Sequence, residues 1–283
     1  MTQDLEQLKQ WIGQHESDID TVTVPSVHRL AATLDRDDPL PKLGDALPIG
    51  WHSILFPRVV RQSQIGPDGH PRRGDFLPPV PLPRRMFAGK RIRFHADLRV
   101  GDAVTRDSTI KDVTIKEGRS GTMVFVTVNA DISSPRGIAI SEEQDIVYRT
   151  EPDPNAPAAA PQPAPGNAVW SKSVTPDPVM LFRYSALTFN GHRIHYDHAY
   201  VTQTEGYPNL VMNGGLTTLL AFELAREHAA APLKFISSRN VRPMFVNRPL
   251  TVCGEPAPDG KHAKLWVVDD KGALTLNATA EFG

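Results

Sequence analysis

The chain has 283 residues, a formal net charge of -1 and 40% hydrophobic residues. This length suits two domains that each bury a core, and the balanced charge argues against a nucleic-acid partner. A single cysteine, Cys253, excludes an intrachain disulfide, and no signal peptide or bilayer-spanning apolar run is evident. We expect a cytoplasmic protein without a membrane partner, which binds small molecules and could form a homodimer.

The first 90 residues are predicted to contain little regular structure. After a polar first helix, a second short helix is predicted from apolar residues at helical spacing, which are Val27, Leu30, Ala31 and Leu34. From 35 to 90 the chain is rich in proline and glycine, which predicts a long ordered loop. Apolar residues within it, such as Trp51 and Phe76, argue against a free linker, and loops of this length are usually functional or disordered.

Alternating apolar and polar residues then predict a meander of four strands. The alternation is clear at 91–100 and 124–132, and the residues EGRSG before the latter predict a hairpin turn. Strands at 108–116 and 138–148 complete this set. The following segment, PDPNAPAAAPQPAPG, has almost no capacity to pack and is typical of an interdomain linker.

The second half of the chain repeats the same order of elements. A helix at about 215–230 precedes strands at 234–245, 250–254, 263–268 and 274–282, and Asp270-Lys271-Gly272 predicts a turn. One helix followed by four strands, twice over, indicates an internal duplication. A helix wrapped by an antiparallel sheet is the hotdog arrangement, so the predicted fold class is α+β, a double hotdog. We expect an N-terminal hotdog at 1–150, a linker at 151–170 and a C-terminal hotdog at 171–283.

A group of acid/base side chains precedes the second predicted helix. It comprises His192, His195, Asp197 and His198, and the helix itself opens with Gly214 and Gly215. A helix start has unpaired N–H groups and a partial positive charge, so it can hold an oxyanion or a polarised carbonyl. The combination predicts an active site. The structural alternative is that Asn213 caps a core helix and the glycines form a plain turn.

The same group of side chains is open to three other interpretations. A metal site is not expected, because the spacing matches none of the helical zinc signatures and no second ligand group is evident. A nucleophilic mechanism is disfavoured, because Cys253 lies in a predicted strand and no serine stands in a G-x-S-x-G context. A third alternative is that the group caps a loop in a non-catalytic module that binds acyl thioesters.

The segment LTFNGHRIHYD resembles the active-site segment of the MaoC-like hydratases and dehydratases, Asp-x-Asn-Pro-aliphatic-His. Asn190 stands at the Asp position, His192 at the Asn and Arg193 at the Pro. Ile194 and His195 match the aliphatic residue and the catalytic histidine. The substituted version FNGHRIHYD is itself similar to the segment found in a branch of the family whose members are double-hotdog chains.

Other segments extend this resemblance over nearly the whole chain. VMNGG is similar to the family's Val-His-Gly segment, with Gly214 at its glycine. DGHPRRGDFLPPVPLPRRMFAGKRIRFHADLRVGD, SGTMVFVTV and DIVYR resemble the N-terminal half of 3-methylfumaryl-CoA (mesaconyl-C4-CoA) hydratases. The resemblance implies a double hotdog whose degenerate N-terminal half shapes the acyl channel, with one active site per chain.

The chemistry implied by the resemblance is reversible hydration of an α,β-unsaturated acyl-CoA, with no cofactor beyond the coenzyme A of the substrate. The helix start at Gly214 and Gly215 would bind the thioester carbonyl, and His195 would transfer protons. Asn190 could only orient the water, because an amide takes no proton at neutral pH. The sequence leaves open whether Asp197 assists His195, and whether hydration or dehydration is the physiological direction.

The resemblance also favours 3-methylfumaryl-CoA as substrate and citramalyl-CoA as product. The carboxylate of this acyl group needs a cation, and an arginine fork suits it best. Candidates that flank the proposed site are Arg84, Arg85, Arg183 and Arg193. Alternatives are an itaconyl-CoA hydratase, a medium-chain enoyl-CoA hydratase, a 3-hydroxyacyl-ACP/CoA dehydratase of fatty-acid metabolism, and the binding module.

Overall fold

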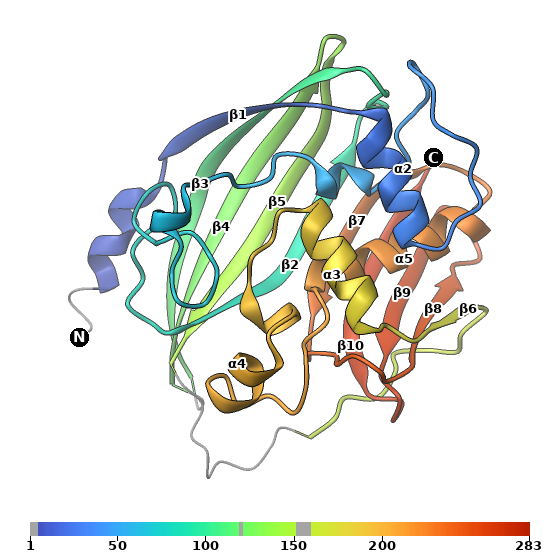
Figure 1. The fold of residues 1–283 in the computed structure, drawn as a ribbon. Coiled ribbons are helices and arrows are strands. Elements are labelled where there is room, and N and C mark those ends of the chain that lie inside the picture. The colour runs from blue at the N-terminus through green and yellow to red at the C-terminus, as the bar shows by residue number, and fades with distance from the viewer. Residues whose placement is uncertain (1–4, 119–120, 151–159) are drawn as a thin grey trace.

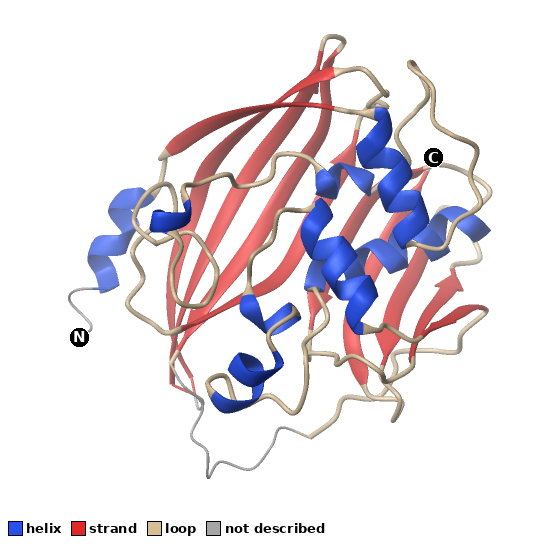
Figure 2. Ribbon diagram, in the orientation of Figure 1, coloured by secondary structure: helices blue, strands red, loops and turns tan. Residues whose placement is uncertain are grey.

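A single antiparallel sheet of ten strands forms the framework of the protein (Figures 1 and 2). The structure is a computed structural model, and it describes residues 5–118, 121–150 and 160–283. The strand order is β1-β3-β4-β5-β2-β7-β10-β9-β8-β6. The first five strands in this order come from the N-terminal half and the last five from the C-terminal half, as expected for an α+β double hotdog.

The two halves of the sheet repeat the same topology and meet at strands β2 and β7. The N-terminal strands are β1 (His15–Thr21), β2 (Arg84–Phe94), β3 (Ala103–Gly118), β4 (Gly121–Ser134) and β5 (Gly137–Arg149). Their C-terminal counterparts are β6 (Trp170–Val174), β7 (Leu233–Asn240), β8 (Leu250–Pro256), β9 (His262–Val268) and β10 (Leu274–Phe282). β2 pairs antiparallel with β7, with Gly89 opposite Arg239 and Arg93 opposite Phe235.

The longer helices repeat less well than the strands. Helix α2 (Val24–Thr33) follows β1 as α3 (Pro178–Leu187) follows β6, and the two helices contact each other. Both start in the same way, because the side chain of Thr23 or Asp177 accepts a backbone N–H and a proline occupies the first turn. The remaining helical elements are η1 (Gln7–Trp11), η2 (Trp51–Ile54), η3 (Gln62–Gln64), η4 (Arg193–His195), α4 (His198–Gln203) and α5 (Gly214–His228).

Helix α5 is the central helix of the molecule, and its N-terminal counterpart is the short 3-10 turn η2. The residues of α5 from 216 to 225 are all buried, so the helix has no solvent-facing side over this length. η2 packs directly against it: a Cβ on Gly50 would lie 2.7 Å from Phe222 Cδ2. Trp51 Nε1 donates to Glu223 Oε1 at 2.8 Å. The helix predicted around 27–34 is α2. Its counterpart in the C-terminal half is α3, and not α5 as the sequence pattern suggested.

The sequence missed or misplaced several element boundaries. Strands β1 and β6 were not predicted, because both are polar edge strands with no buried residue. β2 begins at Arg84, inside the segment predicted to be loop, and ends at Phe94, although Leu98 and Val100 remain buried beyond it. β7 ends at Asn240, five residues before the predicted end at 245.

Two further predictions fall partly outside the described residues. The tip of the predicted EGRSG hairpin includes 119–120, and residues 151–159 of the linker predicted at 151–170 also lie outside the described residues. The domain boundaries at 150 and 171 accordingly stay predictions. In the described ranges, no helix has both the length and the apolar character needed to cross a bilayer.

Candidate active site

His195 lies at the end of η4, where backbone hydrogen bonds hold its ring in one orientation. Its Nδ1 lies 2.7 Å from the carbonyl oxygen of Val211, and Val211 N–H donates to the oxygen of Ile194 at 3.0 Å. A carbonyl oxygen can only accept, so Nδ1 carries the proton and the neutral ring has its lone pair on Nε2. The site therefore presents a basic imidazole nitrogen.

Burial keeps this imidazole neutral. His195 is 6% exposed, and burial lowers its pKa to about 4, although the hydrogen bond to Val211 opposes the shift. Removing a cation from water is costly, so the uncharged ring is the stable form at neutral pH. His195 can accept a proton without first having to lose one.

The start of α5 reaches the site along a short extended segment. Met212 N–H donates to Met244 O at 2.8 Å, and Val246 N–H donates to Leu210 O at 3.1 Å. This segment also carries Val211, which holds His195. Residues 210–212 thus connect His195 to the N-terminus of α5, and hydrogen bonds to residues 244–246 hold them in place.

Gly214 and Gly215 open α5 and are both needed for close packing. A Cβ on Gly214 would lie 3.2 Å from Phe87 Cδ1, and one on Gly215 would lie 2.8 Å from Tyr184 Oη. Their backbone N–H groups belong to the first helical turn, so they have no carbonyl partner four residues earlier. Both glycines line the cavity described below, and their N–H groups are candidates for binding an oxyanion.

Asn213 stands at the N-cap position of α5 without capping the helix. Its side chain makes no capping hydrogen bond, and its Nδ2 donates to Ser185 Oγ at 3.3 Å. Asn213 Oδ1 is buried and has no hydrogen-bond partner among the described residues. The alternative in which Asn213 serves as a conventional side-chain cap is therefore wrong.

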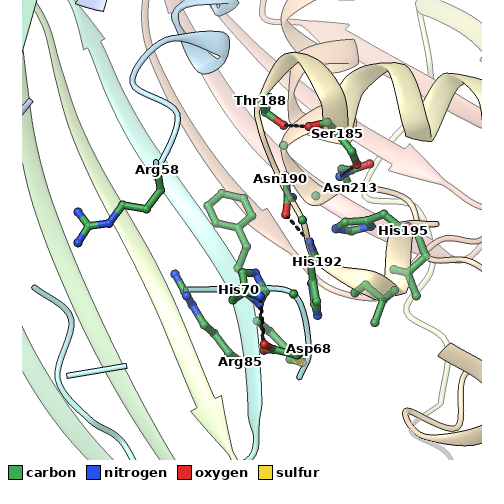
Figure 3. Close-up of a pocket in the computed structure, with 18 of the residues that line it drawn as sticks. Arg58, Asp68, His70, Arg85, Ser185, Thr188, Asn190, His192, His195 and Asn213 are labelled. Atoms are coloured by element: carbon green, nitrogen blue, oxygen red, sulfur yellow. Dashed lines mark hydrogen bonds and ion pairs between the residues drawn. The ribbon is translucent and has the colours of Figure 1, made fainter. Parts of the chain in front are cut away.

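A cavity of about 1410 Å³ brings the two halves of the protein together at this site (Figure 3). His195, Asn190, Gly214 and Gly215 all line it, as do residues from β2 and from the loop before β2. Asn190 Oδ1 accepts the N–H of His192 at 3.0 Å, and this bond leaves the amide Nδ2 of Asn190 as a donor toward a ligand. The predicted catalytic residues thus share one cavity.

The four candidate arginines lie in different environments. Arg84 and Arg85 line the cavity, whereas Arg183 is exposed on α3 and is not among the lining residues. Arg84 is engaged by an ion pair with Glu205, at 3.0 Å. The guanidinium of Arg85 is partly buried and makes no hydrogen bond or ion pair with any described residue. Arg85 is therefore the best placed of the four to bind an anion.

Arg193 and Asp197 hold the catalytic loop in place and do not line the cavity. Arg193 Nη2 lies 2.8 Å from Asp197 Oδ2, and its guanidinium stacks 4.0 Å from the ring centre of Tyr200. Asp197 also caps α4 by accepting Tyr200 N–H at 3.0 Å. The structure therefore gives no support to direct assistance of His195 by Asp197. His198 is exposed and also lies outside the cavity lining.

A second polar group at the site was not found from the sequence. Asp68 and His70 come from the proline-rich loop, and His70 Nδ1 lies 3.1 Å from Asp68 Oδ2. The ring of His70 is centred 4.0 Å from that of His192, which is centred 5.3 Å from that of His195. Local pattern could not find this group, because it joins segments more than 100 residues apart.

The proline-rich loop is attached to the catalytic loop through backbone contacts. Arg193 N–H donates to Asp68 O at 2.9 Å, and Arg193 Nη1 donates to Pro67 O at 3.0 Å. Gly69 lies so close to Gly191 that a Cβ would be 1.8 Å from the Gly191 oxygen. Gly69 also has φ +89°, so glycine is required there for two reasons.

Asp68, His70 and His192 offer metal-ligand atoms that all lie within 4.8 Å of one another. A metal ion would fit this set better than the 192–198 cluster considered from the sequence, since all three are ordinary ligand types. Burial is the main cause that lowers the pKa of His192, to about 2. His192 is therefore a neutral member of the group.

Comparison with known proteins identifies the family. The family model for hydroxyacyl-thioester dehydratase type 2 matches residues 50–246, a range that contains both polar groups and the start of α5. The chain belongs to this family. The mesaconyl-C(4)-CoA hydratase of Chloroflexus aurantiacus is 44% identical over 276 residues, which cover 96% of this chain and 97% of that protein.

A more distant relative carries the same family description, and two solved structures share the fold. The mitochondrial hydroxyacyl-thioester dehydratase type 2 of Schizosaccharomyces pombe is 27% identical over 230 residues, covering 72% of this chain and 76% of that protein. The MaoC-like dehydratase of Phytophthora capsici has a TM-score of 0.69 at 13% identity, and covers 99% of this chain and 98% of its own. HtdX of Mycobacterium tuberculosis has a TM-score of 0.65 at 17% identity, and the match covers 94% of this chain and 99% of HtdX. The family resemblance and the double hotdog are thereby confirmed.

Proposed function

We propose that the protein is a hydro-lyase that adds water reversibly to 3-methylfumaryl-CoA, or mesaconyl-C4-CoA, to give citramalyl-CoA. The 44% identity to a mesaconyl-C(4)-CoA hydratase over 96% of the chain supports this substrate. The structural observation that carries the proposal is the neutral His195, whose basic Nε2 shares a cavity with the N–H groups at the start of α5. We propose a cytoplasmic location and no cofactor beyond the coenzyme A of the substrate.

The first step of the reaction uses His195 as a base. Its Nε2 takes a proton from water as the water oxygen bonds to the β-carbon, and the electrons of the carbon–carbon double bond move toward the thioester. The thioester oxygen gains negative charge, which the N–H groups of Gly214 and Gly215 and the helix dipole stabilise. Asn190 donates a hydrogen bond that orients the water.

The second step returns the proton to the substrate. The His195 imidazolium gives its proton to the α-carbon, the enolate collapses to the thioester, and the ring is neutral again. Since Asn190 cannot act as a second base, one residue serves both steps. The lowered pKa of His195 makes its imidazolium a strong acid, which favours this transfer.

The test compares hydration of 3-methylfumaryl-CoA, itaconyl-CoA and crotonyl-CoA at equal enzyme concentration. We expect 3-methylfumaryl-CoA to have the highest kcat/KM, with the mass of one water added to each product molecule. If crotonyl-CoA is the best of the three, the dicarboxylic substrate must be withdrawn. If none gains water, hydration of these short acyl-CoA thioesters must be withdrawn.

A second candidate is dehydration of 3-hydroxyacyl groups carried by coenzyme A or by a carrier protein. The match to hydroxyacyl-thioester dehydratase type 2 proteins supports it. Loss of water from a 3-hydroxyacyl carrier protein at a higher kcat/KM than from citramalyl-CoA would favour this activity over the first.

A further inference from the structure

The cavity contains polar groups that simple hydration of an enoyl thioester does not require. Arg85 comes from β2, and Asp68 and His70 come from the loop before it. Figure 3 shows His70, His192 and His195 in succession, with Arg85 next to His70. The proposed substrate has a matching feature, because its β-carbon bears a carboxylate as well as the new bond to water. That carboxylate must lie close to His195 during the reaction.

Arg85 has the properties of an anion site. Its guanidinium is partly buried on the cavity wall and has no counterion among the described residues, whereas its neighbour Arg84 is paired with Glu205. A partly buried cation without a partner is unfavourable unless a ligand supplies the opposite charge. A guanidinium can also meet both oxygens of a carboxylate at once.

His70 offers a second polar group to the same ligand. Its Nδ1 lies 3.1 Å from Asp68 Oδ2, and a carboxylate oxygen accepts, so Nδ1 is the donor in this pair. The Nε2 of His70 makes no hydrogen bond with any described residue, and the ring lines the cavity next to Arg85 (Figure 3). Nε2 is therefore open to an oxygen of the carboxylate.

The position of His70 relative to His195 is fixed by the backbone. Arg193 N–H bonds to Asp68 O at 2.9 Å, and Gly69 packs on Gly191 at a distance that admits no side chain. Arg193 lies two residues before His195 in η4. A carboxylate held by His70 and Arg85 would therefore be presented to the catalytic residue in a defined place.

We propose that Arg85 and His70 form a subsite for the carboxylate on the β-carbon of the substrate. This inference rests on the proposed hydratase function and extends it to specificity. The subsite selects acyl thioesters that carry a carboxylate at the reacting carbon, and it orients that carbon toward Nε2 of His195. Asp68 positions His70 without touching the substrate.

The test measures kcat/KM of Arg85→Gln and His70→Gln with 3-methylfumaryl-CoA and with crotonyl-CoA, which lacks the carboxylate. Each variant should lose about ten- to a hundredfold with 3-methylfumaryl-CoA, as expected for a lost hydrogen bond to a charged group, and change little with crotonyl-CoA. Arg85→Lys keeps the charge but not the fork, so it should recover part of the loss. Arg29→Gln, on the exposed face of α2, is the matched control and should match the wild type.

The outcomes separate this subsite from the proposed function. If the wild type prefers 3-methylfumaryl-CoA but Arg85→Gln, Arg85→Lys and His70→Gln lose equally with both substrates, the subsite is wrong and the hydratase stands. If the wild type prefers crotonyl-CoA, the proposed substrate itself fails. If a chelator abolishes turnover and Zn²⁺ alone restores it, His70 serves a metal ion and the subsite is overturned.

Discussion

At the scale of single residues, the site depends on one buried imidazole. The chain offers no carboxylate at the position of Asn190, and Asp197 is engaged by Arg193 and by the start of α4. In the proposed mechanism, proton transfer therefore falls to His195 alone. The backbone carbonyl of Val211 selects its tautomer, so a change in that hydrogen bond would alter which nitrogen faces the substrate.

Replacing His195 by Gln should remove the proton-transfer group while keeping much of its shape. We expect turnover to fall by about a hundredfold or more, in the range of general acid–base catalysis, with near-normal thioester binding. Steady-state kinetics measure the loss of turnover, and binding of a saturated acyl-CoA analogue measures thioester affinity. Comparable turnover in this variant would exclude His195 as the catalytic base.

The pH dependence of kcat/KM should report the lowered pKa of His195. The active form is the neutral ring, which persists above its pKa and is lost as the pH falls through it. The acid limb should therefore lie near pH 4, the value of this buried histidine, and not near the ordinary value of about 6.5. Assays at pH 7 after brief acid exposure control for unfolding. An acid limb near pH 6.5 would show that the working histidine is solvated.

At the scale of elements, the start of α5 is shaped by its packing as well as by its chemistry. Tyr184 on α3 approaches Gly215 so closely that the second residue of the helix must be glycine. The same contact sets the distance between α3 and α5, which together flank the catalytic loop. Small changes here should act on both stability and turnover.

Gly215→Ala should lower the free energy of unfolding by about 1–3 kcal/mol, because the new Cβ meets Tyr184 Oη at 2.8 Å. Turnover should fall as well, since the N–H groups of the helix start shift. Tyr184→Phe removes the clashing oxygen, so the double variant should be more stable than the sum of the single changes predicts. Urea denaturation of the four proteins measures this coupling. Simple additivity would show that the clash is relieved elsewhere.

At the scale of the whole molecule, the two halves share one sheet and one cavity. β2 and β7 join the sheet, Glu223 of α5 binds Trp51 and Arg36 of the N-terminal half, and the proline-rich loop completes the cavity. The N-terminal half covers part of α5, since Gly50 packs against Phe222 and Trp51 is hydrogen-bonded to Glu223. The N-terminal half thus supplies part of the wall of the cavity that His195 and the start of α5 also line.

Expression of residues 171–283 alone should yield aggregated protein. The truncation exposes the edge of β7 and the face of α5 that η2 covers, and such surfaces associate. Solubility after expression and size-exclusion chromatography provide the measurement, with the full chain as control. A soluble and fully active fragment would contradict the interdependence of the halves.

The sequence alone determined the parts that depend on local pattern. Apolar alternation at 124–132 predicted β4, and β10 was placed at 274–282 as observed, because a half-buried strand shows its two faces with period two. The motif around Asn190 and His195, with the glycines after Asn213, predicted residues that line one cavity, and their catalytic roles stay predictions. The polar edge strands β1 and β6 escaped this reasoning, because they bury no side chain and so leave no alternation to read.

Only the tertiary structure decided which side chains meet across the chain. Arg84 and Arg85 are indistinguishable in sequence, yet one is paired with Glu205 and the other is left for a ligand. His70 reaches His192 because a proline-rich loop docks on the catalytic loop through backbone contacts. Such contacts depend on sheet register and on loop path, and periodicity within one element carries no information about either.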